Sequence, residues 1–195
     1  WPGRRRGRRR VGEVHQHHPL KRTWLADGLD AHIHRHDAAI AGDRLPALGD
    51  GLKPGIDVGP CVNESQQQTV QSYVDIGLQQ GAKVVAGGKI PKGADLDKGG
   101  FYRPTVFTDV QPVHRIAKEE IFGPVLSVVR AKTYVEAMAL INGNPWANGV
   151  AIFTNDGGAA RRFQNEVQVG MVGINVPIPV PMAYYSFGGW KNSLF

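Results

Sequence analysis

A cysteine thiolate is the most reactive nucleophile that an unmodified side chain offers at neutral pH, and this sequence contains one cysteine, Cys61. A single cysteine cannot form a disulfide framework within the chain, and its free thiol suits a reducing compartment. We therefore predict a cytoplasmic protein.

Histidine and arginine are concentrated near the start of the chain. Six of the seven histidines lie within residues 15–36, and His32, His34 and His36 would share one face of a strand. No cysteine or suitably spaced carboxylate completes a metal geometry, so we predict no native metal site. The run RRRGRRR at 4–10 could bind phosphates, but neither interleaved aromatic residues nor a folded reader accompanies it. We expect no specific nucleic-acid partner, although a basic-tailed nucleic-acid binder remains one hypothesis.

The composition divides the 195-residue chain into two parts. Residues 1–49 carry nine Arg and one Lys against five acidic residues, whereas 50–195 are almost neutral. Apolar residues in the first part follow neither helical nor strand periodicity, so we predict that 1–49 is a disordered or out-of-frame segment and that 50–195 is one partial domain. Resequencing the genomic locus would test the out-of-frame hypothesis. No stretch approaches the ~20 apolar residues that a membrane span needs.

The second part predicts alternating strands and helices, which is typical of an α/β fold with a largely parallel sheet. The predicted strands are short β-branched runs at 82–86, 105–110, 125–131, 149–154 and 171–175. We predict that 125–131 is buried on both faces, because it is a continuous apolar run.

Three helices are expected between the strands. One spans 64–80 and ends at Gly81, and its inward face is expected to carry Val70, Tyr73, Val74 and Leu78. The second follows Thr133, with Glu136 completing a capping box and Tyr134, Ala137, Met138 and Ile141 facing the core. Asp156 caps the third, which runs to about 166.

Three motifs resemble the aldehyde dehydrogenase superfamily when taken in order and spacing. They are EEIFGPV at 119–125, GVAIFT at 149–154, and GMVGIN at 170–175 followed by SFGGWK at 186–191. The loop PIPVPMA at 177–183 and the ending KNSLF look most like the methylmalonate-semialdehyde dehydrogenase branch. The resemblance implies the C-terminal part of the catalytic domain, here incomplete.

The resemblance also implies site residues. It places Glu120 on the nicotinamide ribose, where a carboxylate can accept hydrogen bonds from two vicinal hydroxyls, and Phe122 beside the same cofactor. Phe187 would line the substrate tunnel. Asn175 would either hold backbone groups near the active site or serve as a structural turn residue.

The family activity is oxidation of an aldehyde or semialdehyde with NAD or NADP through a cysteine thiohemiacetal, with coenzyme A as an additional co-substrate in the acylating branch. The nucleophile of the family lies in a Gly-Gln-x-Cys segment, which this chain lacks, and Cys61 lies in a different setting. We therefore predict no catalytic residue in this chain and no activity of the chain alone. The other hypotheses are a non-catalytic interaction subunit or a pseudogene remnant that pairs with intact aldehyde dehydrogenase, in a homo- or hetero-oligomer.

Overall fold

The computed structural model describes residues 46–177, 179, 184 and 190–193. The arginine run, the six clustered histidines and Phe187 lie outside these residues. The helices are α2 (Glu64–Gln79), α3 (Arg115–Lys118), α4 (Tyr134–Asn142) and α5 (Gly157–Glu166), with a 3₁₀ turn, η1, at Ala94–Asp97. The strands are β1 (Lys83–Ala86), β2 (Thr105–Val110), β3 (Val125–Val129), β4 (Gly149–Ile152) and β5 (Met171–Ile174).

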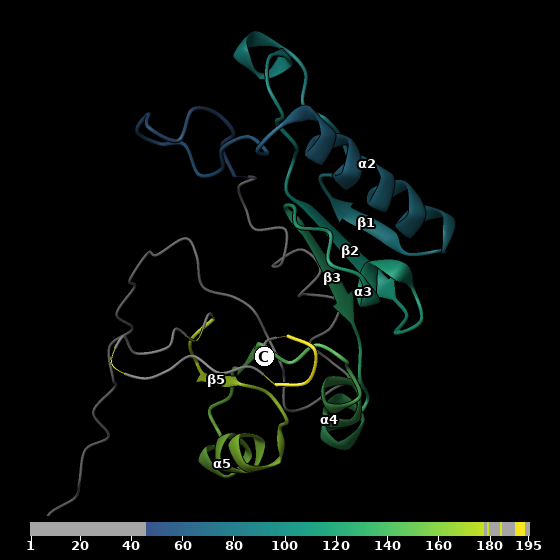
Figure 1. Ribbon diagram of the computed structural model, residues 1–195, viewed down its shortest axis with the longest axis vertical. Coiled ribbons are helices and arrows are strands. Elements are labelled where there is room, and N and C mark those ends of the chain that lie inside the picture. The colour runs from purple at the N-terminus through teal and green to yellow at the C-terminus, as the bar shows by residue number, and fades with distance from the viewer. Residues whose placement is uncertain (1–45, 178, 180–183, 185–189, 194–195) are drawn as a thin grey trace, which may run out of the picture.

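The strands form two small sheets, shown in Figure 1. In the first, β2 lies in the middle, antiparallel to β1 and parallel to β3. In the second, β4 and β5 are parallel. Two of the three pairings are therefore parallel, and the predicted α/β class with a largely parallel arrangement is confirmed.

The predicted starts of two helices are confirmed by the hydrogen bonds of their capping residues. Thr133 Oγ1 accepts from the amide of Glu136 at 3.1 Å, and the Glu136 carboxylate accepts in return from the amide of Lys132 at 2.7 Å. Asp156 Oδ1 accepts from the amides of Gly158 and Ala159 at 2.6 and 3.0 Å. Thr133 and Asp156 thereby satisfy amides that the first turn of a helix leaves unpaired. Glu136 accepts from the amide one residue before Thr133, so the return bond of the predicted capping box is shifted by one residue.

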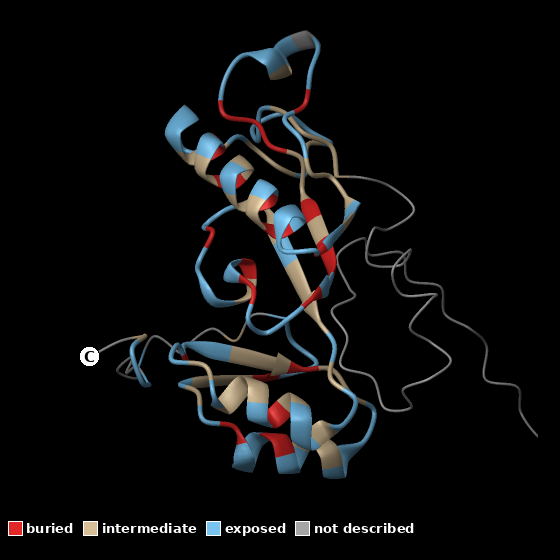
Figure 2. Ribbon diagram, turned by 90° about the vertical axis from the view of Figure 1, so that its right-hand side faces the viewer, coloured by how far each residue is buried: buried red, intermediate tan, exposed pale blue. Residues whose placement is uncertain are grey.

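The first core lies between α2 and the three-stranded sheet. Figure 2 shows buried positions where α2 meets the strands. The buried members of this core are Val70, Val74, Ala82, Tyr102, Phe107, Val110, Ile116 and Ile121. The prediction that Leu78 faces inward is wrong, because Leu78 is half exposed and Gly77 is buried in its place. A Cβ on Gly77 would lie 2.9 Å from Ile116 and 3.0 Å from Phe107, so the helix packs closely on the core at a residue without a side chain.

The strand predicted to be buried on both faces is not fully covered, which corrects that expectation. Residues of β3 are mostly half-buried, and Leu126 is 46% exposed. The reason is the placement of the helices: in the part of the chain that the structure describes, α2 and α3 lie on the same side of the sheet (Figures 1 and 2).

A second core joins α4 and α5 to the β4–β5 sheet. Its buried residues are Met138, Ile152, Phe163 and Val167. Met138 is the center of the predicted inward face of α4, and Tyr134 and Ile141 pack against the same cluster. The Asn142 side chain then ties the two helices together, because it donates to the carbonyl of Glu166 at 3.0 Å and accepts from the amide of Gln168 at 2.8 Å.

Residues 190–193 lie against the loop that follows α4. Lys191 Nζ donates to the carbonyls of Asn142 and Asn144 at 2.5 and 3.0 Å, and Ser193 Oγ accepts from the amide of Ala147 at 2.7 Å. A cationic side chain at the carbonyl end of a helix is a favourable cap.

None of the helices in 46–177 combines the length and apolar character needed to cross a bilayer. Within the same described part, no group of three or more His, Cys, Asp or Glu side chains is arranged to hold a metal ion.

Candidate functional site

The loop between α3 and β3, residues 119–124, carries two of the three predicted site residues. Glu120 and Phe122 are exposed, and Phe122 is 80% accessible. The residue between them, Ile121, is buried in the first core. The loop therefore presents alternate side chains to solvent and to the protein, with Glu120 and Phe122 on the outer side.

The backbone of Phe122 adopts an unusual conformation. Its φ is +54°, in the left-handed region that costs a non-glycine residue roughly 1–2 kcal/mol. Gln66 of α2 holds this conformation, because its Nε2 donates to the carbonyls of Ile121 and Phe122 at 3.0 and 2.9 Å. Backbone strain that is maintained by the surrounding structure is common at ligand sites. Gln66 was not among the predicted site residues.

The loop is also fixed where it enters β3. A Cβ on Gly123 would overlap the side chain of Val70, which is fully buried in α2. The carbonyl of Pro124 then accepts from the amide of Thr105 at 2.8 Å, which opens the β2–β3 pairing. Close packing and register therefore determine where the loop ends.

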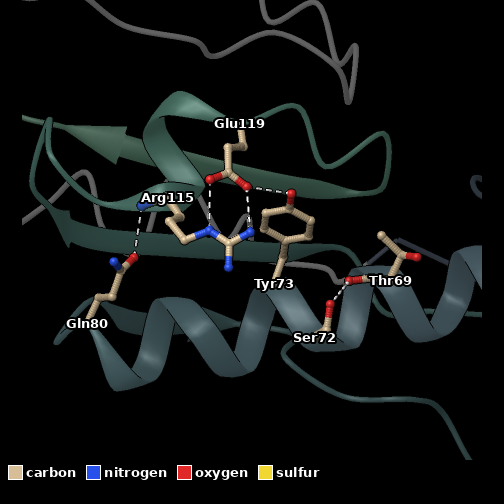
Figure 3. A network of polar contacts seen from close by, with 6 residues as sticks. All are labelled: Thr69, Ser72, Tyr73, Gln80, Arg115 and Glu119. Atoms are coloured by element: carbon tan, nitrogen blue, oxygen red, sulfur yellow. Dashed lines mark hydrogen bonds and ion pairs between the residues drawn. The ribbon is translucent and has the colours of Figure 1, made fainter.

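Glu119, the residue before Glu120, is hydrogen-bonded to Arg115 and Tyr73, as Figure 3 shows. Its Oε1 accepts from Arg115 Nε, and its Oε2 accepts from Arg115 Nη2 and from the Tyr73 hydroxyl, each at 2.7 Å. The Arg115 guanidinium also lies 5.5 Å from the centroid of the Tyr73 ring. The two neighbouring carboxylates therefore differ: Arg115 and Tyr73 donate to Glu119, whereas Glu120 makes no hydrogen bond or ion pair with the described residues.

These contacts set the acidity of Glu119. The hydrogen bonds from Arg115, followed by that from Tyr73, lower the pKa of Glu119 to about 2, and the same bond to Glu119 raises the pKa of Tyr73. A carboxyl with a depressed pKa stabilises the folded state above its unfolded value, and this contribution disappears as the pH falls through the folded pKa.

We expect a ¹³C NMR titration of the Glu119 carboxyl to show a pKa of about 2 in the native chain. In Arg115→Gln the pKa of Glu119 should rise toward the ordinary glutamate value, because both hydrogen bonds from the guanidinium are lost. An unchanged titration in Arg115→Gln would show that Arg115 is not the cause.

A cleft of about 350 Å³ lies beside the loop. Phe122, Gly123 and Pro124 form one wall, and the segment around Cys61 together with Gln66 forms the other. Glu120 lies on the same loop but does not line this cleft, and Phe187 lies outside the described residues. The structure therefore brings together Phe122 and Gln66, while the roles expected of Glu120 and Phe187 stay predictions.

Cys61 lies in the cleft with the properties of an unactivated thiol. It is half-buried, and burial raises its pKa, which its own backbone hydrogen bond offsets only in part. Catalytic thiols show the opposite shift, because the thiolate is the reactive species.

Alkylation of Cys61 by iodoacetamide should therefore rise about tenfold per pH unit to beyond pH 9, since the rate follows the thiolate fraction. Intact-mass measurement of the full chain between pH 6 and 10 checks this. A rate that levels off below pH 7 would identify an activated thiol and contradict our interpretation of Cys61.

Asn175 follows β5 in the left-handed conformation, at φ +57°. Its Oδ1 accepts from the amide of Thr154 at 2.9 Å, and its Nδ2 donates to the carbonyl of Thr154 at 3.1 Å. The side chain thereby joins the carboxyl ends of β4 and β5, the edge of a parallel sheet where ligands commonly bind. Asn175 was expected either to hold backbone groups near the active site or to serve as a structural turn residue. Its side chain does hold the backbone of Thr154, and the nearness of this contact to an active site stays a prediction.

The comparisons with known proteins identify the family. A sequence model described as the aldehyde dehydrogenase family matches residues 32–195, and the chain belongs to this family. The match begins before residue 50, the start of the domain expected from composition, and that boundary remains a prediction.

The similar curated proteins are semialdehyde dehydrogenases. The chain is 51% identical over 148 residues to a malonate-semialdehyde dehydrogenase of Pseudomonas aeruginosa, which covers 76% of this chain and 30% of the relative. It is 44% identical over 147 residues to a probable acylating methylmalonate-semialdehyde/malonate-semialdehyde dehydrogenase of Dictyostelium discoideum, covering 75% and 28% of the two chains. The predicted resemblance to this branch is confirmed, and the chain spans about three tenths of the length of these relatives.

Solved structures agree. A putative methylmalonate-semialdehyde dehydrogenase of Sinorhizobium meliloti, complexed with NAD, superposes with a TM-score of 0.73 at 49% identity, covering 76% of this chain and 30% of that one. A betaine aldehyde dehydrogenase of Staphylococcus aureus, also in complex with NAD, superposes with a TM-score of 0.71 at 35% identity, covering 74% and 29%.

Proposed function

We propose that this chain supplies the nicotinamide-ribose side of an NAD(P)-dependent aldehyde dehydrogenase that oxidises a semialdehyde. The observation that carries the proposal is the 119–124 loop, which α2 fixes on both sides of Glu120 while Glu120 and Phe122 stay exposed. Because the backbone of the site is already ordered, little conformational entropy is lost when the ligand binds.

The residues present fit a nicotinamide cofactor. Glu120 is an exposed carboxylate on a fixed backbone, and its two oxygens can accept from the two hydroxyls of a ribose. Phe122 offers an exposed aromatic face two residues away, where it can pack against the nicotinamide side of the cofactor. Phe187 is proposed as a wall of the substrate tunnel.

Glu120 and Phe122 would hold the nicotinamide cofactor, which would supply the hydride acceptor for oxidation of the substrate. The chain's own residues bind and orient: Glu120 fixes the ribose, Phe122 excludes water from one side, and Gln66 keeps both in place through the loop backbone. NAD is the first candidate because the superposed structures are NAD complexes. Coenzyme A is proposed as co-substrate because the Dictyostelium relative is named as acylating.

No residue of this chain is proposed as the nucleophile, because the raised pKa of Cys61 disfavours its thiolate. We therefore expect the full 195-residue chain alone to form no NADH from NAD and malonate semialdehyde. Self-association, or association with an intact aldehyde dehydrogenase, is proposed as the context in which it acts.

A hybrid enzyme tests the proposal. In the hybrid, the matched 148-residue segment of the Pseudomonas aeruginosa relative is replaced by that of this chain. We expect NADH formation from malonate semialdehyde, and retention of that activity in Cys61→Ala. A hybrid that melts cooperatively and oligomerises as its parent does, yet neither binds NAD in calorimetry nor forms NADH, would overturn the proposal.

A further inference from the structure

Helix α2 carries a polar stripe that contacts the site segment along its whole length. Its members are Gln66, Tyr73 and Gln80, the last being the C-cap, and they recur every seven residues. Seven residues are close to two helical turns, so the three side chains lie on one face.

Each member of this stripe holds a different part of residues 115–122. Gln80 Oε1 accepts from the amide of Arg115 at 2.9 Å, at the start of α3. The Tyr73 hydroxyl donates to Glu119 at 2.7 Å, directly before Glu120. Gln66 donates to the carbonyls directly after Glu120. Figure 3 shows Gln80 and Tyr73 in their contacts with Arg115 and Glu119.

The segment needs such support because it has little structure of its own. Helix α3 is four residues long, a single turn, and isolated turns are not stable. The Arg115–Glu119 pair is largely exposed, with side-chain accessibilities of 50% and 39%, and exposed pairs contribute little to global stability. Its contribution is therefore expected to be local order of the loop.

We propose that Tyr73, acting through Glu119 and Arg115, is a positioning residue that sets the direction of the Glu120 carboxylate for cofactor binding. This inference rests on the proposed function. Tyr73 does not itself touch the cofactor; it fixes the residue before Glu120, as Gln66 fixes those after it. Loss of its hydroxyl should therefore loosen residues 120–123 and weaken NAD binding without slowing the chemical step.

Tyr73→Phe tests this because it removes only the hydroxyl and keeps the ring beneath Arg115. Tyr134→Phe is the matched control: Tyr134 also lies beneath a guanidinium, that of Arg162 at 4.5 Å, but in the second core. In hydrogen-exchange mass spectrometry of the full chain, we expect exchange of the hydrogen-bonded amides on either side of Glu120, those of Glu119 and Val125, to rise at least tenfold in Tyr73→Phe. Exchange in β4 and β5, and all exchange in the control, should stay within twofold of the native chain.

In the hybrid, Tyr73→Phe should raise KM for NAD about three- to tenfold and leave kcat within twofold. If Glu120→Gln raises this KM but Tyr73→Phe changes neither it nor the loop exchange, the inference fails and the proposed function stands. If exchange rises equally throughout the chain, Tyr73 is merely structural and the inference also fails. If Glu120→Gln leaves the KM unchanged, the proposed function itself fails, and the positioning role fails with it.

Discussion

Glu120→Gln in the hybrid enzyme is expected to raise KM for NAD by roughly 10- to 100-fold. A hydrogen bond to a charged group contributes about 1.5–3 kcal/mol, and each 1.4 kcal/mol corresponds to about tenfold in binding. The amide keeps one acceptor oxygen but loses the charge and the second acceptor. Initial rates at varied NAD, with calorimetric NAD binding, measure the effect.

Glu64→Gln is the control for a lost surface charge, because Glu64 is exposed in the first turn of α2. Its KM for NAD should stay within twofold of the unmodified hybrid. Equal effects of the two substitutions would mean that general electrostatics, and not a ribose contact, accounts for the change.

Gly87→Ala is expected to lower the free energy of unfolding by about 3 kcal/mol, the largest loss of stability that we anticipate from one added methyl group. Gly87 has φ +73°, and a Cβ there would overlap the carbonyl oxygen of Pro104 and lie 2.8 Å from Thr105 Cα. Both are backbone atoms at the start of β2, so no side-chain rotation relieves the contact. Urea denaturation followed by far-ultraviolet circular dichroism, which reports on α2 as well as on the other helices, gives the difference.

Gly81→Ala is the control that separates the cost of a positive φ from the cost of a steric overlap. Gly81 also has a positive φ, +92°, but an added Cβ there would meet nothing within 4 Å. This variant should lose only about 1–2 kcal/mol, the cost of the left-handed backbone. If Gly81→Ala and Gly87→Ala proved equally destabilised, crowding against Pro104 would not be the reason.

The local features of the fold could be predicted from the sequence, because they depend on neighbouring residues. The caps at Thr133 and Asp156 and the positive φ of Gly81 each involve residues within a few positions of one another. The prediction that Leu78 faces inward was wrong because a pattern of apolar side chains does not include glycine, and α2 approaches Phe107 at Gly77. Such an approach depends on tertiary packing.

The candidate site was predictable only in part. Resemblance to the family singled out Glu120, but nothing in the pair Glu119-Glu120 distinguishes the two carboxylates. The difference comes from Tyr73, 46 residues from Glu119 in the sequence, and from Arg115 one helical turn away. Gln66 was missed for the same reason, since its partners lie 55 and 56 residues further along. The seven-residue recurrence of Gln66, Tyr73 and Gln80 was the available signal.

The division of the interior into two clusters, one around Phe107 and one around Phe163, has a consequence for how the protein opens. Clusters with separate memberships behave as separate cooperative units, each with its own opening free energy. Subglobal opening of the Phe163 unit would break the hydrogen bonds of Lys191 and Asn175. The hydrogen bonds of Gln66 and Tyr73 to the 119–124 loop would remain. A substitution that destabilises the Phe163 cluster would therefore leave the opening free energy of the Phe107 cluster unchanged.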